Sequence, residues 1–593
     1  MALFFLQVVD AGARSLRMIY QSKLAPKYDF LQEKNMEFLL SLLNSENENV
    51  TGLGASIITH SCETSAEQNA LCDAGVLKKL IGLLQGSLSQ RDASLESIAT
   101  VIKSNPEVVS KFVGPENGRA LSAVTELTKD RYPRTRLLAC MCLIVVRNTS
   151  PGCLQDLAIR TKLILILLEL LDDPGQVGDE ASFALSSLIA EKEDLQKLAF
   201  EGNAIDKLCN HLQKGSLQAK RFQGILLALA DLCSKLENCR SRFLALQVMN
   251  SVIDALTHDS GEVRAAACIC LRSVSRSVKN LSAGNFMNET VVIPLVQLLS
   301  DTSTSVQVCN EHVQGVAEFA MHIYLVLLEL RVPVIKRAYD ETSLQLYLCQ
   351  VAALGAISNI VVDFTTRKSI FMQCGGVKQL VQLSKSMDPT IRLNSVWGLR
   401  NLMFLADNRC KEGIFLELTA SLLASLICDP EPSVQVQALG LVCNLVDGCI
   451  NSVEYVFVED SIILQAVGKQ LQSTLKAEVG IQGMYVLSNV ATGNEFHKEA
   501  VMHQLFPQAG NSTQPIIIKF LQSNDSRLRT AAVWTVLNLT FPGSLGAYGR
   551  FVKLCSAGIL SQIKNMANDP CLDVKLRVRT VLGQSLTFGD GST

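Results

Sequence analysis

The sequence predicts an all-α fold in which similar helical units stack into a solenoid. Thr390 to Phe404 is the clearest unit: its apolar residues form one stripe of a helix, while Asn394, Trp397 and Asn401 lie on another face. The pattern recurs along the chain, with asparagines 42, 43, 45 and 49 residues apart. A helical pattern with a period of roughly 40–47 residues is typical of a solenoid. The recurring asparagines, which we call the ladder, are Asn359, Asn401, Asn444, Asn489 and Asn538.

Length and composition agree with this fold class. A chain of 593 residues is too long for one compact core, so several domains or a repeat array is expected, and the recurring helix favours the array. Hydrophobic residues make up 48% and charged residues 19% of the chain, which fits stacked helices buried on most faces. The longest apolar runs contain glutamate and are too short for a bilayer, so no membrane partner is expected. The net charge of −2 argues against nucleic acid as a partner.

The 19 cysteines are predicted to be core residues in a reducing compartment. They are scattered singly, and the close pairs Cys140/Cys142 and Cys268/Cys270 lie within helical patterns without the CxxC spacing of zinc knuckles. We therefore expect neither a disulfide framework nor a metal site.

Two features of the helical unit resemble armadillo repeats. A tryptophan precedes the ladder asparagine by four residues in Trp397/Asn401 and Trp534/Asn538, as in armadillo third helices. The segments CGGVKQLVQLSKSMDP and CSAGILSQIKNMANDP resemble armadillo second helices entered through a glycine turn. The resemblance implies a right-handed armadillo-repeat superhelical solenoid of about twelve repeats. The same register predicts, at the ladder position of the other units, Ser56, Ser97, Ile144, Ser187, Asp231, Ser275 and Ser585.

The repeats divide the chain into five predicted segments. The string SVQV occurs twice. At Ser433–Val436 it is followed directly by QALGLVCN. At Ser305–Val308 it is separated from the similar string AALGAISN by Cys309–Val351. We interpret this piece as a retained intron or an isoform-specific exon. The segments are a partial repeat (1–34), armadillo repeats without the ladder (35–308), a non-repeat insertion (309–351), armadillo repeats with the ladder (352–588) and a tail (589–593).

Four stretches carry a more specific resemblance: EVRAAACICLRSVSRSVKNL, AALGAISNIVVDFTTRKSIFMQCGGVKQLVQL, DPTIRLNSVWGLRNLMF and SRLRTAAVWTVLNLT. They resemble the armadillo-repeat subunits of GID/CTLH ubiquitin ligases from about Arg14 onward, without the family's first repeats and without a counterpart of 309–351. The resemblance implies a non-catalytic scaffold that bridges the RING-bearing ligase core to the subunit recognising N-terminal degrons. In that family the C-terminal half holds the receptor and the N-terminal half contacts the core. It also implies a role in proteasomal degradation, in cytoplasm and nucleus.

The ladder predicts a groove that binds an extended peptide. A carboxamide offers both a donor and an acceptor, so each asparagine can bond the backbone of a segment without a sheet partner, between flat aromatic walls. The alternative is that the asparagines bond the neighbouring repeat and the aromatic residues fill space. The candidate partner-binding residues are Asn359, Arg392, Asn394, Trp397, Arg400, Asn401, Asn444, Tyr485, Asn489, Trp534 and Asn538.

Charge narrows the expected ligand. The ladder helices carry four arginines, Arg392, Arg400, Arg527 and Arg529, but scarcely an acidic residue, Glu478 being the exception. A neutral-to-basic groove suits an uncharged or acidic tail, or a C-terminal carboxylate. An importin-α-like adaptor would need acidic residues around the ladder, so it ranks below a ligase scaffold, and a β-catenin-like scaffold stands between them.

An enzyme is the least favoured class. The seven histidines lack metal-ligand spacing, and no phosphate-cradling glycine loop or nucleophile elbow occurs. We therefore predict no catalytic residue, no metal ligand and no cofactor.

Overall fold

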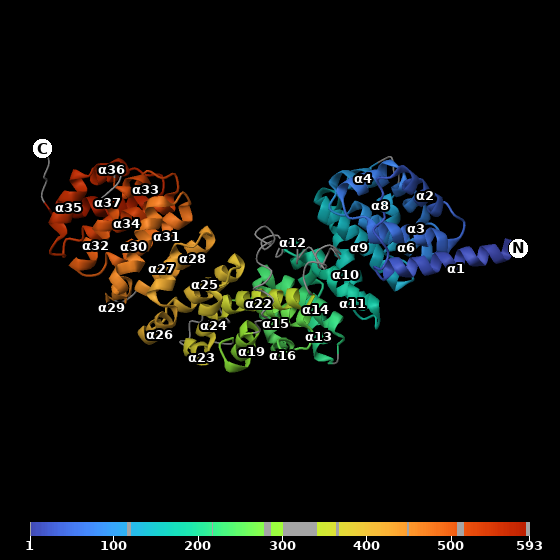
Figure 1. Ribbon diagram of the computed structural model, residues 1–593, viewed down its shortest axis with the longest axis horizontal. Coiled ribbons are helices and arrows are strands. Elements are labelled where there is room, and N and C mark those ends of the chain that lie inside the picture. The colour runs from blue at the N-terminus through green and yellow to red at the C-terminus, as the bar shows by residue number, and fades with distance from the viewer. Residues whose placement is uncertain are drawn as a thin grey trace. The chain divides into compact units, whose positions relative to one another are not determined.

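The protein consists of two helical units. The computed structural model describes residues 2–114, 120–215, 217–277, 286–300, 341–362, 367–447, 450–506 and 515–588. The first unit contains α1 to α17 and the second α19 to α37 (Figure 1). No strand occurs in these ranges, and the predicted all-α solenoid is confirmed.

In the first unit the helices are α1 (Ala2–Gln21), α2 (Glu33–Leu43), α3 (Glu48–Ser61), α4 (Ser65–Asp73), α5 (Val76–Leu83), α6 (Leu88–Ile102), α7 (Pro106–Val113), α8 (Ala120–Leu127), α9 (Pro133–Thr149), η2 (Pro151–Leu154), α10 (Leu157–Leu170), α11 (Gln176–Ile189), α12 (Glu193–Glu201), α13 (Ala204–Gln213), α14 (Ala219–Lys235), α15 (Glu237–Ala245), α16 (Met249–Ala255) and α17 (Gly261–Val274). In the second unit they are α19 (Glu289–Ser300), α22 (Glu341–Ile360), α23 (Lys368–Gln373), α24 (Gly376–Leu383), α25 (Pro389–Met403), α26 (Asn408–Leu418), α27 (Ala420–Ile427), α28 (Pro432–Val446), α29 (Ile450–Val453), η4 (Glu454–Phe457), α30 (Val458–Ser473), α31 (Ala477–Val490), α32 (Glu495–Leu505), α33 (Ile516–Leu521), α34 (Ser526–Leu539), α35 (Ala547–Ser556), α36 (Ile559–Asn565) and α37 (Leu572–Leu586).

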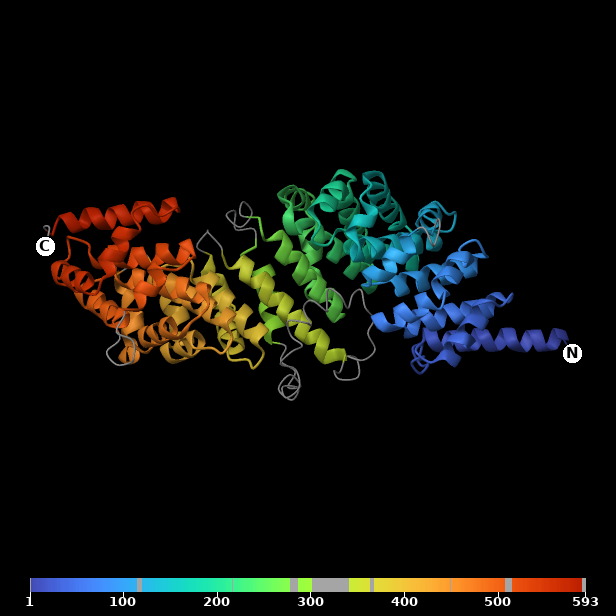
Figure 2. The ribbon, with the colours of Figure 1, turned by 90° about the horizontal axis from the view of Figure 1, so that it is seen from above.

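The third helices of successive repeats pack on one another within each unit. In the second unit α25 contacts α28, α28 contacts α31, and α34 and α37 continue the series, which Figure 2 shows in yellow to red. In the first unit α3, α6, α9, α11, α14 and α17 form the corresponding series. Each of these helices therefore packs against its neighbours in the series, as expected of a solenoid.

Local sequence explains the ladder helix α25. Asp388 caps its N-terminus by accepting a hydrogen bond from the backbone N–H of Ile391 at 2.9 Å, and Pro389 occupies the first turn, where no N–H is needed. The apolar stripe buries Val396, Leu399 and Met403 completely. The helix thus starts at a cap and is held by its buried face.

Glycine turns join the first and second helices of several repeats, as predicted. Gly75, Gly375 and Gly558 precede α5, α24 and α36 with φ of 77°, 78° and 75°, in the left-handed region that favours glycine. In the segment EGNAID the left-handed residue is Asn203 at φ 60°, one position later than the glycine. Asparagine adopts the left-handed conformation more readily than most residues, so this turn forms with asparagine instead of glycine at the left-handed position.

This turn gives a prediction with an internal control. Gly375→Ala should lower the free energy of unfolding of the second unit by about 1–2 kcal/mol, because alanine is strained at positive φ even where no atom lies within 4 Å. Gly549→Ala, at an equally open site inside α35, should raise it by about 0.5–1 kcal/mol. Urea unfolding measures both changes in the free energy of unfolding. If the two variants changed it in the same direction, the backbone conformation of Gly375 would not explain the effect.

The predicted boundary at residue 352 lies inside α22. This helix runs from Glu341 to Ile360, and within it Cys349 and Val351 are 2% exposed while the Gln350 side chain donates to the Leu299 carbonyl at 3.1 Å. Residues 349–351 therefore belong to a packed repeat helix. Residues 309–340, the rest of the predicted insertion, lie outside the described residues, and so does the tail 589–593. The remaining segment boundaries stay predictions.

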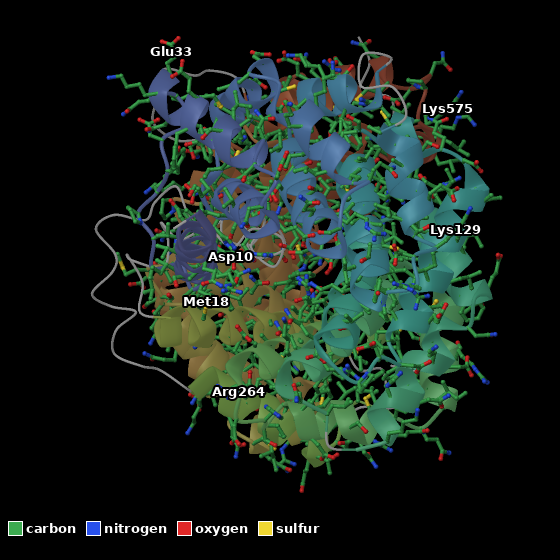
Figure 3. The ribbon with its side chains drawn as sticks, turned by 90° about the vertical axis from the view of Figure 1, so that its right-hand side faces the viewer. Asp10, Met18, Glu33, Lys129, Arg264 and Lys575 are labelled. Carbon is green, nitrogen blue, oxygen red and sulfur yellow. The ribbon has the colours of Figure 1, made fainter. Side chains whose placement is uncertain are left out.

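The cysteine pairs lie in the core, as expected. Cys140, Cys142, Cys268 and Cys270 are all fully buried, and burial raises the pKa of Cys142 to about 12. None of the described cysteines forms a disulfide. Charged side chains such as Glu33 and Lys129 lie instead at the surface (Figure 3). Within the described ranges, no helix is long and apolar enough to cross a membrane.

Candidate functional site: the ladder helices of the second unit

The ladder asparagines share one register. Asn401, Asn444, Asn489 and Asn538 each lie thirteen residues after the N-cap of their helix, and the fifth, Asn359, lies near the end of α22. Trp397, Tyr485 and Trp534 each follow the N-cap by nine residues. All are partly exposed. Equal offsets on helices that pack in series place these side chains on one face of the second unit.

Four ladder asparagines bond the preceding repeat. The acceptor is each time the backbone carbonyl of the residue before the preceding ladder asparagine. The alternative left open by the sequence, a hydrogen bond to the neighbouring repeat, is therefore present. The Nδ2 donors and carbonyl acceptors are Asn401 to Ser358 at 2.7 Å, Asn444 to Arg400 at 2.9 Å, Asn489 to Cys443 at 3.3 Å and Asn538 to Ser488 at 2.9 Å.

These bonds use only part of each carboxamide. An asparagine has two N–H donors and an oxygen with two lone pairs. In the described part of the chain, the side chains of Asn401, Asn444 and Asn489 have no hydrogen-bond partner beyond the neighbouring carbonyl. One N–H and the oxygen remain, which is one donor and one acceptor, as a peptide unit requires. The bond to the neighbouring repeat therefore leaves hydrogen-bonding groups of the amide unused, and the peptide-binding groove stays a prediction.

A second row of amides accompanies the ladder, and of its members only Asn394 was among the predicted residues. Asn394, Gln437 and Gln482 each follow the N-cap by six residues, seven before the ladder asparagine. Seven residues span roughly 10.5 Å of helix. An extended segment has hydrogen-bonding neighbours roughly 4.8 Å away on each edge, so the two rows match its width. The fixed offset of seven was visible in the sequence.

The second row is also partly engaged. Asn394 Nδ2 donates to the Thr390 carbonyl at 2.8 Å, and Gln437 Oε1 accepts from Arg400 Nη1 at 2.9 Å. The Cys443 thiol lies 4.0 Å from Gln482 Oε1 and 3.5 Å from the Gln482 backbone carbonyl oxygen. These contacts fix the side chains of the second row, just as the bonds to neighbouring carbonyls fix the ladder asparagines.

Arg577 covers one aromatic wall. Its guanidinium carbon lies 4.6 Å from the centroid of the Trp534 ring, and Nη1 donates to the Asp573 carbonyl at 2.9 Å. The neighbouring wall, Tyr485, has its pKa raised by burial. At this end of the ladder a cation and a ring therefore share the surface.

The predicted basic character of the groove needs correction at three arginines. Arg392 makes a two-pronged ion pair with Asp429, with Nε and Nη2 at 2.8 and 3.0 Å from its carboxylate oxygens, and also bonds the Ser386 and Met387 carbonyls. Its side chain is 14% exposed. Arg529 pairs in the same way with Asp569. Arg392 therefore holds a turn between repeats, and its charge is compensated.

The third arginine is Arg527, which pairs with Asp525 at 2.7 Å and Glu478 at 3.2 Å. Its charge is thus also met by carboxylates. A contact of Arg392 with a partner stays a prediction, but the charge argument no longer extends to Arg392, Arg527 or Arg529.

The ladder register of other helices also needs correction. Ser97 Oγ donates to the Ala93 carbonyl of its own helix and to the Ala55 carbonyl of the preceding repeat. Thr535 Oγ1 makes the same two kinds of bond, to the Ala531 carbonyl and to the preceding repeat, so Ser97 and Thr535 occupy equivalent positions. Thr535 lies three residues before Asn538, so Thr100 rather than Ser97 corresponds to the ladder position. In α37 the position thirteen residues after the N-cap is Gln584 rather than Ser585.

Two buried lysines stabilise the ends of ladder helices. Lys368 and Lys411 are 4% and 5% exposed. Lys368 Nζ donates to the Leu402 carbonyl at 3.0 Å, and Lys411 Nζ to the Leu445 carbonyl at 3.1 Å. A cation beside the last carbonyls of a helix is favourable. Sequence reasoning missed both, because a surface lysine and a buried one look alike in a helical pattern.

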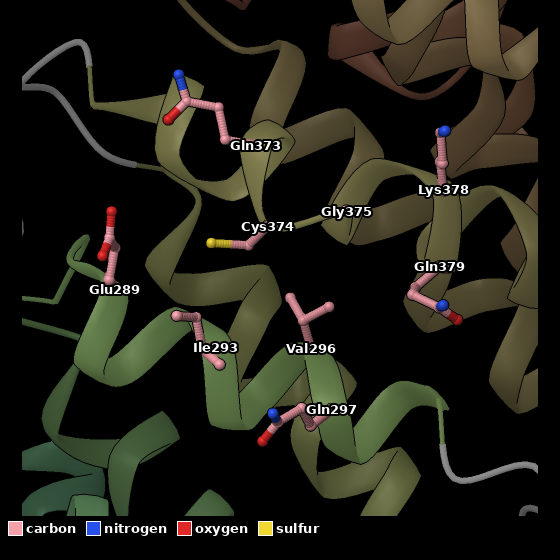
Figure 4. Close-up of a pocket in the computed structure, with 9 residues that line it drawn as sticks. All are labelled: Glu289, Ile293, Val296, Gln297, Gln373, Cys374, Gly375, Lys378 and Gln379. Carbon is pink, nitrogen blue, oxygen red and sulfur yellow. The ribbon is translucent and has the colours of Figure 1, made fainter.

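A pocket away from the ladder lies between α19 and α24. Glu289, Ile293 and Val296 of α19 face the turn at Cys374 and Gly375 (Figure 4). Burial raises the pKa of the Cys374 thiol, so the thiol is not activated. Among the described residues, no group of three His, Cys, Asp or Glu side chains is placed to hold a metal ion.

Known proteins resemble this chain along nearly its whole length. Residues 235–460 match the family model described as the VID28/GID5 C-terminal domain. "Armadillo repeat-containing protein 8" from Danio rerio is 24% identical over an alignment that covers 98% of this chain and 82% of the relative. The chain is thus similar to armadillo repeat-containing protein 8 along nearly its whole length. "GID complex subunit 5" from Schizosaccharomyces pombe is 24% identical, with 71% of this chain and 52% of the relative covered. The family resemblance expected from the sequence is thus confirmed.

Solved structures resemble the chain more distantly. An engineered protein known from a crystal structure gives a TM-score of 0.44 with 16% identity, over 93% of this chain and 98% of that chain. A designed armadillo repeat protein in complex with the peptide (KR)4 gives a TM-score of 0.35 with 18% identity, over 41% of this chain and 95% of that chain.

Proposed function

We propose that this chain is a non-catalytic scaffold subunit of a GID/CTLH-type ubiquitin ligase. The observation that carries the proposal is the alignment with armadillo repeat-containing protein 8 over 98% of the chain. The match to relatives named as GID complex subunit 5 supports it. In this proposal the chain bridges the RING-bearing core to the degron-recognising subunit, works in cytoplasm and nucleus, and supports proteasomal degradation.

The second unit is proposed to hold an extended segment of the receptor subunit. The remaining N–H and oxygen of Asn401, Asn444 and Asn489 supply one donor and one acceptor per rung. Trp397, Tyr485 and Trp534 supply apolar walls. Successive packed helices lie roughly 8–10 Å apart and an extended chain rises roughly 3.3 Å per residue, so one rung meets about every third residue. Backbone bonding then provides affinity, and the walls provide selectivity. The first unit is left to contact the core.

Copurification tests the proposal. The chain is expressed with an affinity tag in cells of its source, intact and without residues 309–340, the part of the predicted insertion outside α22. The proteins recovered with each form are identified by mass spectrometry. Recovery of RING-bearing ligase subunits together with a degron receptor is the expected result. Recovery of karyopherins or cadherin tails instead, with no ligase subunit from either form, would refute the ligase assignment.

A further inference from the structure

Arg400 stands out among the arginines of the ladder helices by what it contacts. It belongs to α25, but its side chain reaches across to α28, where Nη1 donates to Gln437 Oε1 at 2.9 Å. A Cβ atom at Gly440 would lie 2.5 Å from Arg400 Nε and 2.6 Å from Cζ. The guanidinium therefore lies directly against Gly440, a contact that any side chain larger than glycine would obstruct.

Gly440 occupies the wall position of its helix. It follows the N-cap Glu431 by nine residues, as Trp397, Tyr485 and Trp534 follow theirs. Where the neighbouring repeats present an aromatic ring, this repeat presents a guanidinium. The plane is flat, like a ring, but it carries a positive charge and N–H donors.

The charge of Arg400 is not compensated by an acid. Arg392, Arg527 and Arg529 pair with carboxylates, whereas the hydrogen-bond partner of Arg400 is a neutral amide. No ion pair of Arg400 occurs within the ranges that the structure describes. One of its five N–H groups is used by Gln437. The backbone carbonyl of Arg400 also accepts the bond from Asn444, so the charge lies beside a ladder rung.

We propose that Arg400 is the anion-selective position of the groove and binds a carboxylate of the partner segment next to the rungs Asn401 and Asn444. The carboxylate is either an Asp or Glu side chain or the C-terminus of the segment, because both offer the paired oxygens that a guanidinium bonds best. The proposal rests on the proposed function only in taking the partner to be an extended segment in the groove.

Peptide libraries test this position. The probes are decapeptide libraries of small uncharged residues in which one position is fixed as Glu, Gln or Lys, each made with an amidated and with a free C-terminus. Fluorescence anisotropy measures their affinity for the full chain. The wild type should prefer Glu over Gln, or the free C-terminus over the amide, by about tenfold, and which preference is seen identifies the carboxylate.

Three variants distinguish Arg400 from general electrostatics. Arg400→Gln should reduce the preference to less than about twofold, and Arg527→Gln, which removes an exposed and paired arginine from the same helix series, should leave it unchanged. Gln437→Glu should also abolish the preference, because it supplies a carboxylate to Arg400 within the protein. This variant keeps Arg400 and its packing, so it tests the charge even if Arg400→Gln does not fold.

The inference is overturned if the wild type shows no preference, if the preference survives both Arg400→Gln and Gln437→Glu, or if Arg527→Gln removes it equally. Peptide binding without anion preference would overturn the role of Arg400 but not the groove. Absence of binding by every library would overturn both, while ligase membership would still be decided by copurification.

Discussion

Arg550→Met is expected to lower the free energy of unfolding of the second unit by about 2–3 kcal/mol. Arg550 is 1% exposed and connects three parts of the structure. Its Nε donates to the Leu539 carbonyl at the end of α34 at 2.9 Å, Nη1 to Glu495 at 2.6 Å and Nη2 to Ser544 at 2.5 Å. Methionine fills much of the volume but satisfies none of these acceptors. Because Glu495 is 39% exposed, it stays hydrated in the variant. The expected loss therefore lies at or below the lower end of the roughly 3–5 kcal/mol that breaking a buried pair costs.

Urea unfolding measures this loss, and Arg527→Met is the matched control. The Arg527 side chain is 62% exposed, so its replacement should cost less than about 1 kcal/mol. Equal losses from the two variants would show that burial of Arg550 does not determine its contribution.

The loss from Arg550→Met should depend on pH. The pKa of Glu495 is lowered from 4.5 to about 2, chiefly by its hydrogen bond with Arg550 and further by hydrogen bonds from Ser544 and the Gly546 N–H. A carboxylate with a lowered folded-state pKa adds stability above its ordinary pKa and loses it as the pH falls toward the folded value. The difference in unfolding free energy between wild type and Arg550→Met should therefore shrink from pH 4.5 to pH 2. A constant difference over this window would mean that the Glu495 pair does not contribute.

The double variant Trp397→Ala/Asn401→Ala is expected to weaken binding of the receptor subunit by more than about 2 kcal/mol while leaving helix content unchanged. It removes one wall and one rung together. The bond from Asn401 to the Ser358 carbonyl adds a second consequence, a loss of about 0.5–1.5 kcal/mol in stability. Titration calorimetry with the recovered receptor and circular dichroism measure the two effects.

Thr535→Val separates binding from stability. Thr535 is fully buried, and its hydroxyl also bonds the preceding repeat, at the Met484 carbonyl at 3.2 Å. Valine removes this bond without touching the exposed ladder face, so stability should fall by a similar amount while binding is retained. If Thr535→Val weakens receptor binding as much as the double variant does, the effect arises from altered packing between repeats and Trp397 and Asn401 do not form the binding site.

The sequence could predict the ladder helices because their pattern is local. The cap, the aromatic residue and the asparagine recur at fixed offsets within one helix, so Trp397/Asn401 and Trp534/Asn538 could be placed before any contact was known. The predicted ladder position was wrong in helices that carry no asparagine or aromatic residue at these offsets. In the first unit the sequence pattern places Ser97 at the ladder position. Its hydrogen bonds to two carbonyls show that it lies three residues before that position.

Pairing between repeats could not be predicted in the same way. Whether Arg392 faces a ligand or an acid depends on Asp429, which lies one repeat further along the chain, and on the Ser386 and Met387 carbonyls of a turn. The asparagine side chain poses the same problem, since either the neighbouring repeat or a peptide satisfies it.

The sequence by itself determined the helical class, the repeats and the helix face that carries the amides and aromatic rings, because these depend on periodicity along the chain. Only the tertiary structure decided which of those groups are already engaged. It assigns Arg392, Arg527 and Arg529 to carboxylates and leaves Arg400 against Gly440 with a neutral partner. Charge compensation depends on distance between side chains of different repeats, and periodicity contains no information about that distance.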